Sequence, residues 1–502
     1  MALEEIRQSI ETERIIGEER VQIPVRAEAI VPGAGRDAVV VLLEEARLTM
    51  GEVDVQTDRV VVDGSLSAQA LYKLGEDGEA GALRANAALS RAIDLPGAAA
   101  GMSCLCEAGV EHVESSYENG HIVFQAVVGL HVRVLALEKT ELITALNGEE
   151  GLELKQEPVS SMKISAESSA QAVLEGDARM PPVLDARTAL MDWGTVRIDD
   201  ASADLGGVKV SGAVLAEALV GSGVPGRPVA LVKYSLPFAQ LVELPDWLCE
   251  RVEASAGLNR LSARLQQAED GGTNLHFDAE VDVRVKALGE DSVSALADAY
   301  GVGGADLRCE YAPVSFCSGV EPISLRETVR TNMMLPEGAP SPGTVIALRV
   351  RPQIGQIDSA ACGSRISGIL ETQALYLASG SGALCSAKEE LPFAIDCPVA
   401  LTDSDAIELE TESADATALM NDRLEVSCAL HVTGAHRSEK ELRLLRSAAA
   451  EPVEKTPFSV VFYWPSREEE LWEIGKRYRV PMQRLAELNA SRCEGEPLVV
   501  RG

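Results

Sequence analysis

The chain contains three copies of one module, and this internal repetition limits its possible folds more than any other feature. The motif Gln-Ala-Leu-Tyr occurs twice, each time ending eight residues after a glycine, and Glu-Ala-Leu-Val ends at the same distance from a third glycine. Prolines flank each glycine at 30 to 33 residues, at Pro32 and Pro96, Pro181 and Pro245, and Pro336 and Pro398. Such regular offsets predict a repeat of roughly 150 residues, long enough for each copy to form its own core. The three motif segments are 64–72, 212–220 and 368–376.

Each copy carries the pattern of β-strands. From Arg59 to Ala70 apolar residues tend to alternate with polar ones, which is the period-two pattern of a strand with one buried face. Glycine-rich segments at 75–81, 221–226 and 379–382 occupy equivalent places and predict hairpin loops. We therefore expect each copy to form a twisted, largely antiparallel sheet or sandwich with short helical connections.

The C-terminal residues have a different pattern. Leu471 and Ile474, and again Leu485 and Leu488, lie three residues apart, which predicts two short helices with one apolar stripe each. The β-prone segment 459–464 precedes these helices and 497–500 follows them. The predicted order is strand, helix, helix, strand, in a module too small to be an enzyme.

Together these patterns predict a mainly β fold, with three tandem sandwich-like repeats followed by a small α+β domain of βααβ order. Pro158-Val159-Ser160 and Pro313-Val314-Ser315 recur at the junctions between copies. We place the boundaries at 1–157, 158–312 and 313–445 for the repeats, 446–457 for a polar linker and 458–502 for the last domain.

Composition excludes several classes of function. The formal net charge of −33 would repel nucleic acid and anionic membranes, whose phosphates need clustered Lys and Arg. This acidity indicates either simple solubility or an acidic face that docks a basic partner. None of the ten cysteines forms a C-x-x-C pair, which argues against zinc sites and for a reducing compartment. Because we find neither a signal peptide nor an apolar run of 18 residues, we expect a cytoplasmic protein without a transmembrane segment.

Catalytic motifs are also missing from the sequence. The segment Gly221–Gly226 satisfies G-x-G-x-x-G, but the residues after it indicate a strand where a dinucleotide site needs a helix. The six histidines show no H-E-x-x-H pattern, and there is neither a G-x-S-x-G nor a phosphate-binding loop motif. We predict that the protein is not an enzyme and uses neither a cofactor nor a metal ion.

The repeat resembles the SPOCS domain of clostridial spore-coat assembly proteins. That family carries motifs of the forms E-T-x-R-x-x-G-E, D-K-V-x-V-x-G followed by L-Y, L-P-F and D-A-Y-S. The matching residues here are Glu11–Glu18, Asp58–Gly64 with Leu71-Tyr72, Leu236–Phe238 and Leu391–Phe393, and Asp298–Tyr300, where Gly301 replaces the family's serine. The resemblance spans about residues 10–445.

The C-terminal module resembles a LysM domain through Leu471–Tyr478 and Leu485–Asn489. LysM modules bind glycans through a Gly-Asp-Thr loop before the first helix, and here Glu468, Glu469 and Glu470 occupy that place. This difference favours a protein partner over an anionic wall polymer. Trp472 could fill the small core or anchor the partner, and one of Tyr463 and Trp464 should be exposed because they alternate in a strand. The predicted partner-binding residues are Tyr463, Trp464, Arg467, Glu469, Trp472, Lys476, Arg477, Arg484 and Asn489.

Tandem SPOCS modules before one LysM module imply a scaffold or adaptor of the spore coat. The resemblance implies a site of action in the mother-cell cytoplasm at the forespore surface, where the LysM-like module would bind the ATPase of the coat's basement layer. The alternative is a protein that binds the glycan strands of peptidoglycan and attaches to the wall or cortex. A third possibility is a general envelope or stress protein built from the same modules.

Overall fold

The structure is a computed structural model that describes residues 3–33, 39–75, 78–147, 151–244, 251–302, 305–360, 362–402, 405–420, 422–452, 460–466, 469–490 and 496–501. Three successive sections of this described chain repeat one arrangement of two three-stranded antiparallel sheets. The prediction of a mainly β fold is thus confirmed. In contrast, a 3-10 turn at Pro182–Leu184 is the only helical element that the described parts of these three sections contain. In these described parts, short helical connections are thus limited to this turn, whereas other antiparallel strands are joined by turns of two residues, as between Gln56 and Arg59.

In each unit one sheet contains two long strands and a shorter one, and the other sheet contains three strands of similar length. The orders are β1-β6-β5 and β2-β3-β4 in the first unit, β7-β12-β11 and β8-β9-β10 in the second, and β13-β18-β17 and β14-β15-β16 in the third. The bounds are β1 Glu4–Ile30, β2 Val39–Gln56, β3 Arg59–Leu74, β4 Ala80–Asp94, β5 Ser103–Glu118, β6 His121–Asn147, β7 Leu152–Arg179, β8 Ala186–Asp204, β9 Gly207–Ser222, β10 Val229–Glu243, β11 Arg251–Gln267, β12 Thr273–Gly301, β13 Ala305–Met334, β14 Pro342–Ala360, β15 Gly363–Ala378, β16 Leu384–Cys397, β17 Ala406–Leu419 and β18 Arg423–Pro452. β18 extends to Pro452, into the segment that the sequence suggested as a linker.

The two sheets of each unit form a sandwich over a separate apolar core. Alternate residues of the paired strands, such as Val128, Leu130 and Val132 of β6, are almost fully buried. The second and third units have equivalent cores, in which Val281 and Leu430 are fully buried. The period-two pattern seen in the sequence therefore places each apolar face inside a sandwich.

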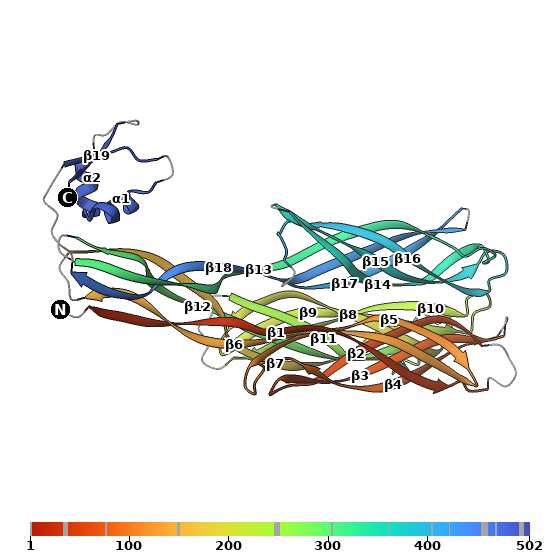
Figure 1. Ribbon diagram of the computed structural model, residues 1–502. Coiled ribbons are helices and arrows are strands. Elements are labelled where there is room, and N and C mark those ends of the chain that lie inside the picture. Colours follow the sequence, from red (N-terminus) through yellow and green to blue (C-terminus); the bar gives the residue numbers. More distant parts are fainter. Residues whose placement is uncertain are drawn as a thin grey trace.

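The long strands continue past the sandwiches as two-stranded ribbons. The third strand of each long sheet ends near a register shift, which lies between Ile15 and Gly17 in the first unit. Beyond the shift only the outer parts of β1 and β6, β7 and β12, and β13 and β18 remain paired. We call these three ribbons the stem; Figure 1 shows the ribbons of β12, β13 and β18 extending from the sandwiches toward both termini. A second shift in each ribbon leaves one strand with an extra residue, at Thr144, Ala297 and Arg446.

The three units meet in shared cores to which each contributes equivalent residues. Leu71, Leu219 and Leu375, at the same position of the sequence repeat, are fully buried in one cluster together with Trp193. In the stem, Leu142, Ala295 and Leu444 occupy the same place relative to the second shift and are buried in another cluster. The units thus form an approximately threefold arrangement within one chain.

The C-terminal module consists of β19 (Val460–Tyr463), α1 (Leu471–Tyr478), α2 (Met482–Leu488) and β20 (Leu498–Arg501). β19 pairs with β20 in antiparallel fashion, so the order is βααβ, as expected from the helical and strand patterns. Ile474, Val480, Leu485, Leu498 and Val500 form its core. Figure 1 shows the module beside the stem, at the end that holds the N-terminus.

Candidate partner-binding site

The C-terminal module contacts the stem through a partly buried carboxylate. Asp298 of β12 follows the extra residue Ala297, and its side chain accepts hydrogen bonds from two residues of α1. The donors are Trp472 Nε1 at 2.7 Å and Lys476 Nζ, which lies 2.6 Å from Oδ1 and 2.8 Å from Oδ2. Tyr311 of β13 donates a third hydrogen bond at 2.5 Å. Hydrogen bonds to a charged group contribute about 1.5–3 kcal/mol each. Replacing one of these donors by an apolar side chain would therefore weaken the contact.

Tyr300, two residues farther along β12, completes the contact. Its ring meets the Trp472 ring edge to face, with 4.9 Å between centroids and an interplanar angle of 68°. The Tyr300 hydroxyl donates a hydrogen bond of 2.8 Å to the carbonyl of Val480. A Cβ on Gly475 would come within 2.6 Å of that hydroxyl, so the glycine allows α1 to approach closely. At the edge of the contact, Lys155 pairs with Glu470 at 2.9 Å.

The electrostatics of this contact keep Asp298 charged. Burial opposes its ionisation, but hydrogen bonds from Lys476, Trp472 and Tyr311 outweigh that effect and hold the pKa of Asp298 below its ordinary value of 3.8. Burial, together with the neighbouring negative charges, raises the pKa values of Tyr300 and Tyr311. Both phenols are therefore neutral hydrogen-bond donors at physiological pH.

Two large aromatic side chains are exposed to solvent on the outer face of β19 and just after it. Phe462 is 57% and Trp464 is 67% exposed, and because they are two residues apart they share one face of the extended chain. We call this pair the aromatic face. Between them, Tyr463 donates a hydrogen bond of 2.7 Å to Glu469 and accepts one of 2.7 Å from Arg477. The expectation that one of Tyr463 and Trp464 is exposed holds, and it is Trp464.

The structure divides the predicted partner-binding residues into several groups. Trp472 and Lys476 face the stem, whereas Trp464 faces outward, and Tyr463, Glu469 and Arg477 form the network beside it. Arg484 is exposed on α2, and Arg467 lies outside the described residues. Asn489 is structural, because its side chain bonds the backbone of Leu485 and Val499.

Trp472 lies outside the module's own core, which was one of the two places considered from the sequence. It is only 8% exposed, yet the module's own core consists of other residues, and its ring packs against Tyr300 of the stem. Sequence reasoning also missed Asp298, Tyr300 and Tyr311 as contact residues. For two of them the sequence carries a signal, the motif Asp298-Ala299-Tyr300, although the motif by itself indicates no contact.

A polar cavity of about 1770 Å³ lies between the three sandwiches. Both signs of charge line it, including Arg284 and Arg351 and the carboxylates of Glu107 and Glu410. Desolvation in this cavity and the neighbouring charges of Glu408 and Glu412 raise the pKa of Glu410 to about 7. Within the described part of the chain, no group of three or more histidine, cysteine or carboxylate side chains could hold a metal ion.

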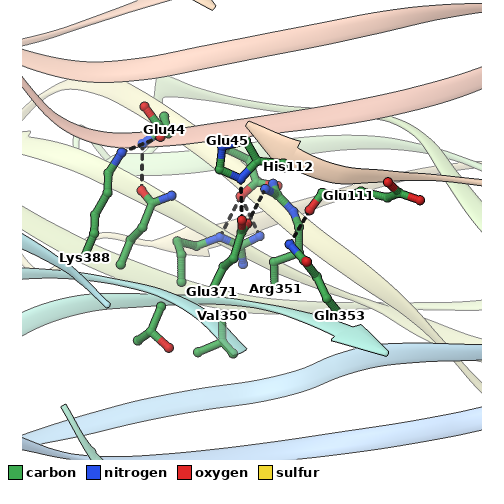
Figure 2. Close-up of polar contacts among 12 residues, drawn as sticks. Glu44, Glu45, Glu111, His112, Val350, Arg351, Gln353, Glu371 and Lys388 are labelled. Carbon is green, nitrogen blue, oxygen red and sulfur yellow. Dashed lines mark hydrogen bonds and ion pairs between the residues drawn. The ribbon is translucent and has the colours of Figure 1, made fainter. Parts of the chain in front are cut away.

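Beside this cavity, ion pairs join the first and third units, as Figure 2 shows. Arg349 bonds Glu45 at 2.7 and 2.9 Å, and Arg351 lies between Glu45 and Glu371 at 3.7 and 3.4 Å. Although burial opposes its ionisation, these arginines keep the pKa of Glu45 low. His112 contacts Glu371 at 2.5 Å in the same group. The network resembles an interface between units more than a catalytic site, because its charges already neutralise one another.

The repeated glutamines have the same joining role. The side chain of Gln69 bonds the backbone N–H and C=O of Asp192 in the second unit. The equivalent Gln373 accepts a hydrogen bond of 3.1 Å from the N–H of Glu44 in the first unit. The recurring Gln-Ala-Leu-Tyr motif therefore supplies contacts between units as well as core residues.

Comparison with known protein families identifies a match to part of the chain. Residues 37–118 match the family model of the SPOCS domain of SipL, which points to a protein related to sporulation and the spore coat. This is not a known family of enzymes. No curated protein and no solved structure is significantly similar to the chain. Among the described helices, none combines the length and apolarity that crossing a membrane would require.

Proposed function

We propose that the protein is a non-enzymatic scaffold or adaptor of spore-coat assembly, which links the basement-layer ATPase of the coat to the forespore surface. It acts in the mother-cell cytoplasm at that surface. The C-terminal module, which we identify with a LysM domain, binds the ATPase as a protein partner. The three repeated units provide an elongated body that holds the module at one end.

The observation that carries this proposal is the exposed aromatic face of the module. Large aromatic side chains dominate the energy of many protein interfaces when a partner buries them. Phe462 and Trp464 are exposed side by side, next to the charged pair Glu469–Arg477, whose ends are 2.8 Å apart. This combination of an apolar centre and a charged rim is typical of a protein-binding surface.

The acidic loop before α1 favours a protein over a wall glycan. Glu470 is directed to Lys155 of the stem, and Glu469 is held by Tyr463 and Arg477. These side chains place negative charge where a glycan-binding LysM loop would approach its sugars. On a polymerised coat layer, many copies of the scaffold would engage together, so avidity would compensate for modest affinity at each module.

The test is capture of the purified coat ATPase by the full chain, by a chain ending at Glu454, and by the Trp464→Ala variant of the full chain. We expect capture by the full chain, a loss of about tenfold or more for Trp464→Ala, and no capture after truncation. Leu205→Ala is the matched control, because Leu205 is 94% exposed at the turn between β8 and β9.

Two outcomes would overturn the proposal. Equal capture by the full and truncated chains would move the partner site to the repeated units. Cosedimentation of the full chain with purified peptidoglycan, lost on truncation and combined with no capture of the ATPase, would support the wall-binding alternative instead.

A further inference from the structure

We propose that Asp298, Tyr300 and Tyr311 form a docking site for helix α1, and that docking within the chain competes with a partner that binds through Trp472 and Lys476. We call these three stem residues the docking site. The competition rests on the proposed function, whereas the docking itself does not. The C-terminal module would thus have two surfaces. The aromatic face is accessible to a partner, and the face of α1 with Trp472 and Lys476 is covered by the stem.

The hydrogen-bonding groups of the docking site match the side chains of α1 that contact it. One carboxylate of Asp298 receives an indole N–H, an ammonium group and a phenol O–H, so nearly all its acceptor capacity is used. Trp472 and Lys476 are four residues apart and therefore lie on one face of α1. The site recognises a helix that presents an indole and an amine at this spacing.

Only the stem ribbon of the second unit carries an aspartate and a tyrosine at the positions of Asp298 and Tyr300. Relative to the second register shift, the positions of Asp298 and Tyr300 are occupied by Ala145 and Asn147 in the first unit. In the third unit they are occupied by Ser447 and Ala449. The repeated architecture alone does not produce a docking site, so these side chains are a specialised feature of the second unit and its neighbour β13.

Docking hides part of the module and leaves the rest accessible. Trp472 is 8% exposed in the docked state, whereas Phe462 and Trp464 are 57% and 67% exposed. A partner that needs only the aromatic face can bind the docked protein. A partner that also uses Trp472 and Lys476 must first displace the stem. Its apparent affinity is then the intrinsic affinity multiplied by the fraction of molecules that are undocked. Because the module and the stem belong to one chain, rebinding is an intramolecular event, which favours the docked state.

The first test measures docking in the full chain by hydroxyl-radical footprinting, with Asp298→Asn and Lys476→Gln as variants. We expect the oxidation rate of Trp472 to rise about tenfold in both variants, because the charge-assisted hydrogen bonds are lost. The rate for Trp464 should stay unchanged. Asp270→Asn is the control, since it removes the same charge at the distant turn between β11 and β12. Unchanged Trp472 oxidation in both variants would overturn the docking site.

The second test measures affinity for the purified coat ATPase. Asp298→Asn should bind several-fold more tightly than the unmodified protein, because the stem no longer competes for α1. Unchanged or weaker binding, with Trp472 freely oxidised, would refute the competition. If neither protein bound the ATPase, the competition would fall with the proposed function, and footprinting would still decide the docking site.

Discussion

At the scale of single residues, Asp298 shows how one carboxylate can join parts of the chain that are far apart in sequence. Its partners Tyr311 of β13 and Trp472 and Lys476 of α1 belong to two segments that only the fold brings together. Burial alone would favour the neutral acid, and the three donors reverse that preference. The strength of docking therefore depends on the charge of Asp298.

Docking should accordingly depend on pH. Because the pKa of Asp298 is lower in the docked state than its ordinary value of 3.8, the carboxylate contribution is complete above about pH 5 and disappears as pH falls through the lowered pKa. Tyr311, whose pKa burial raises, stays neutral over this range and does not contribute to the loss. Footprinting of Trp472 between pH 8 and pH 3 measures this loss, with circular dichroism as a check that the body remains folded. Asp298→Asn should be insensitive to pH, and a midpoint above pH 5 would contradict the assignment.

At the scale of elements, the repeated glycines explain how each short sheet bends. Gly64, Gly212 and Gly368 each lie beside a register shift, with Thr49, Arg197 and Gln353 respectively on the neighbouring strand. A Cβ at any of these glycines would collide with the carbonyl oxygen of that neighbouring residue. The neighbouring strand can thus approach closely at the bulge only where a side chain is missing.

We expect Gly368→Ala to lower the free energy of unfolding by about 1–3 kcal/mol, because the added methyl group forces the backbone of β14 away. Gly257→Ala is the matched control, since Gly257 lies in β11 with no atom within 4 Å of an added Cβ. The control should change stability by less than about 0.5 kcal/mol. Urea unfolding of both variants measures the difference. Equal stabilities would show that the backbone of β14 moves aside without loss of free energy.

At the scale of the whole molecule, three units of one chain are held together by shared apolar clusters and by polar contacts around the one that contains Trp193. Trp193 is central to this assembly, being 1% exposed in the cluster shared by the three units. Arg349 of the third unit lies 5.1 Å above its ring and also bonds Glu45 of the first unit. One side chain from each unit therefore meets at this point.

Trp193→Ala should destabilise the molecule by about 3–5 kcal/mol, since it removes a large buried side chain and leaves a cavity. Because the cavity lies between units, we also expect the body to loosen, which small-angle X-ray scattering would detect as a larger radius of gyration. Trp464→Ala, which removes an exposed tryptophan, should change stability by less than about 0.5 kcal/mol. A similar loss of stability in both variants would show that the side chain of Trp193 is not central to the contact between units.

The sequence by itself determined the class of fold and the nature of its elements. Alternation of apolar residues and the turn glycines are local signals, so they predict strands, hairpins and the βααβ order of the last module without knowledge of distant contacts. Short helical connections were expected in every copy, and the described residues show one of them, because nothing local distinguishes a short turn from a short helix between strands. The ribbons of the stem were not foreseen, since a strand inside a sandwich and one in a ribbon can carry the same alternation.

Only the tertiary structure decided which surfaces meet. Trp472 looked like either a core residue or a partner anchor, and it became an intramolecular contact because α1 lies against Tyr300, 172 residues earlier in the chain. Trp464, eight residues before Trp472, remained exposed. The free energy of such contacts depends on which side chains the fold brings within a few ångströms, and local pattern carries no information about that distance.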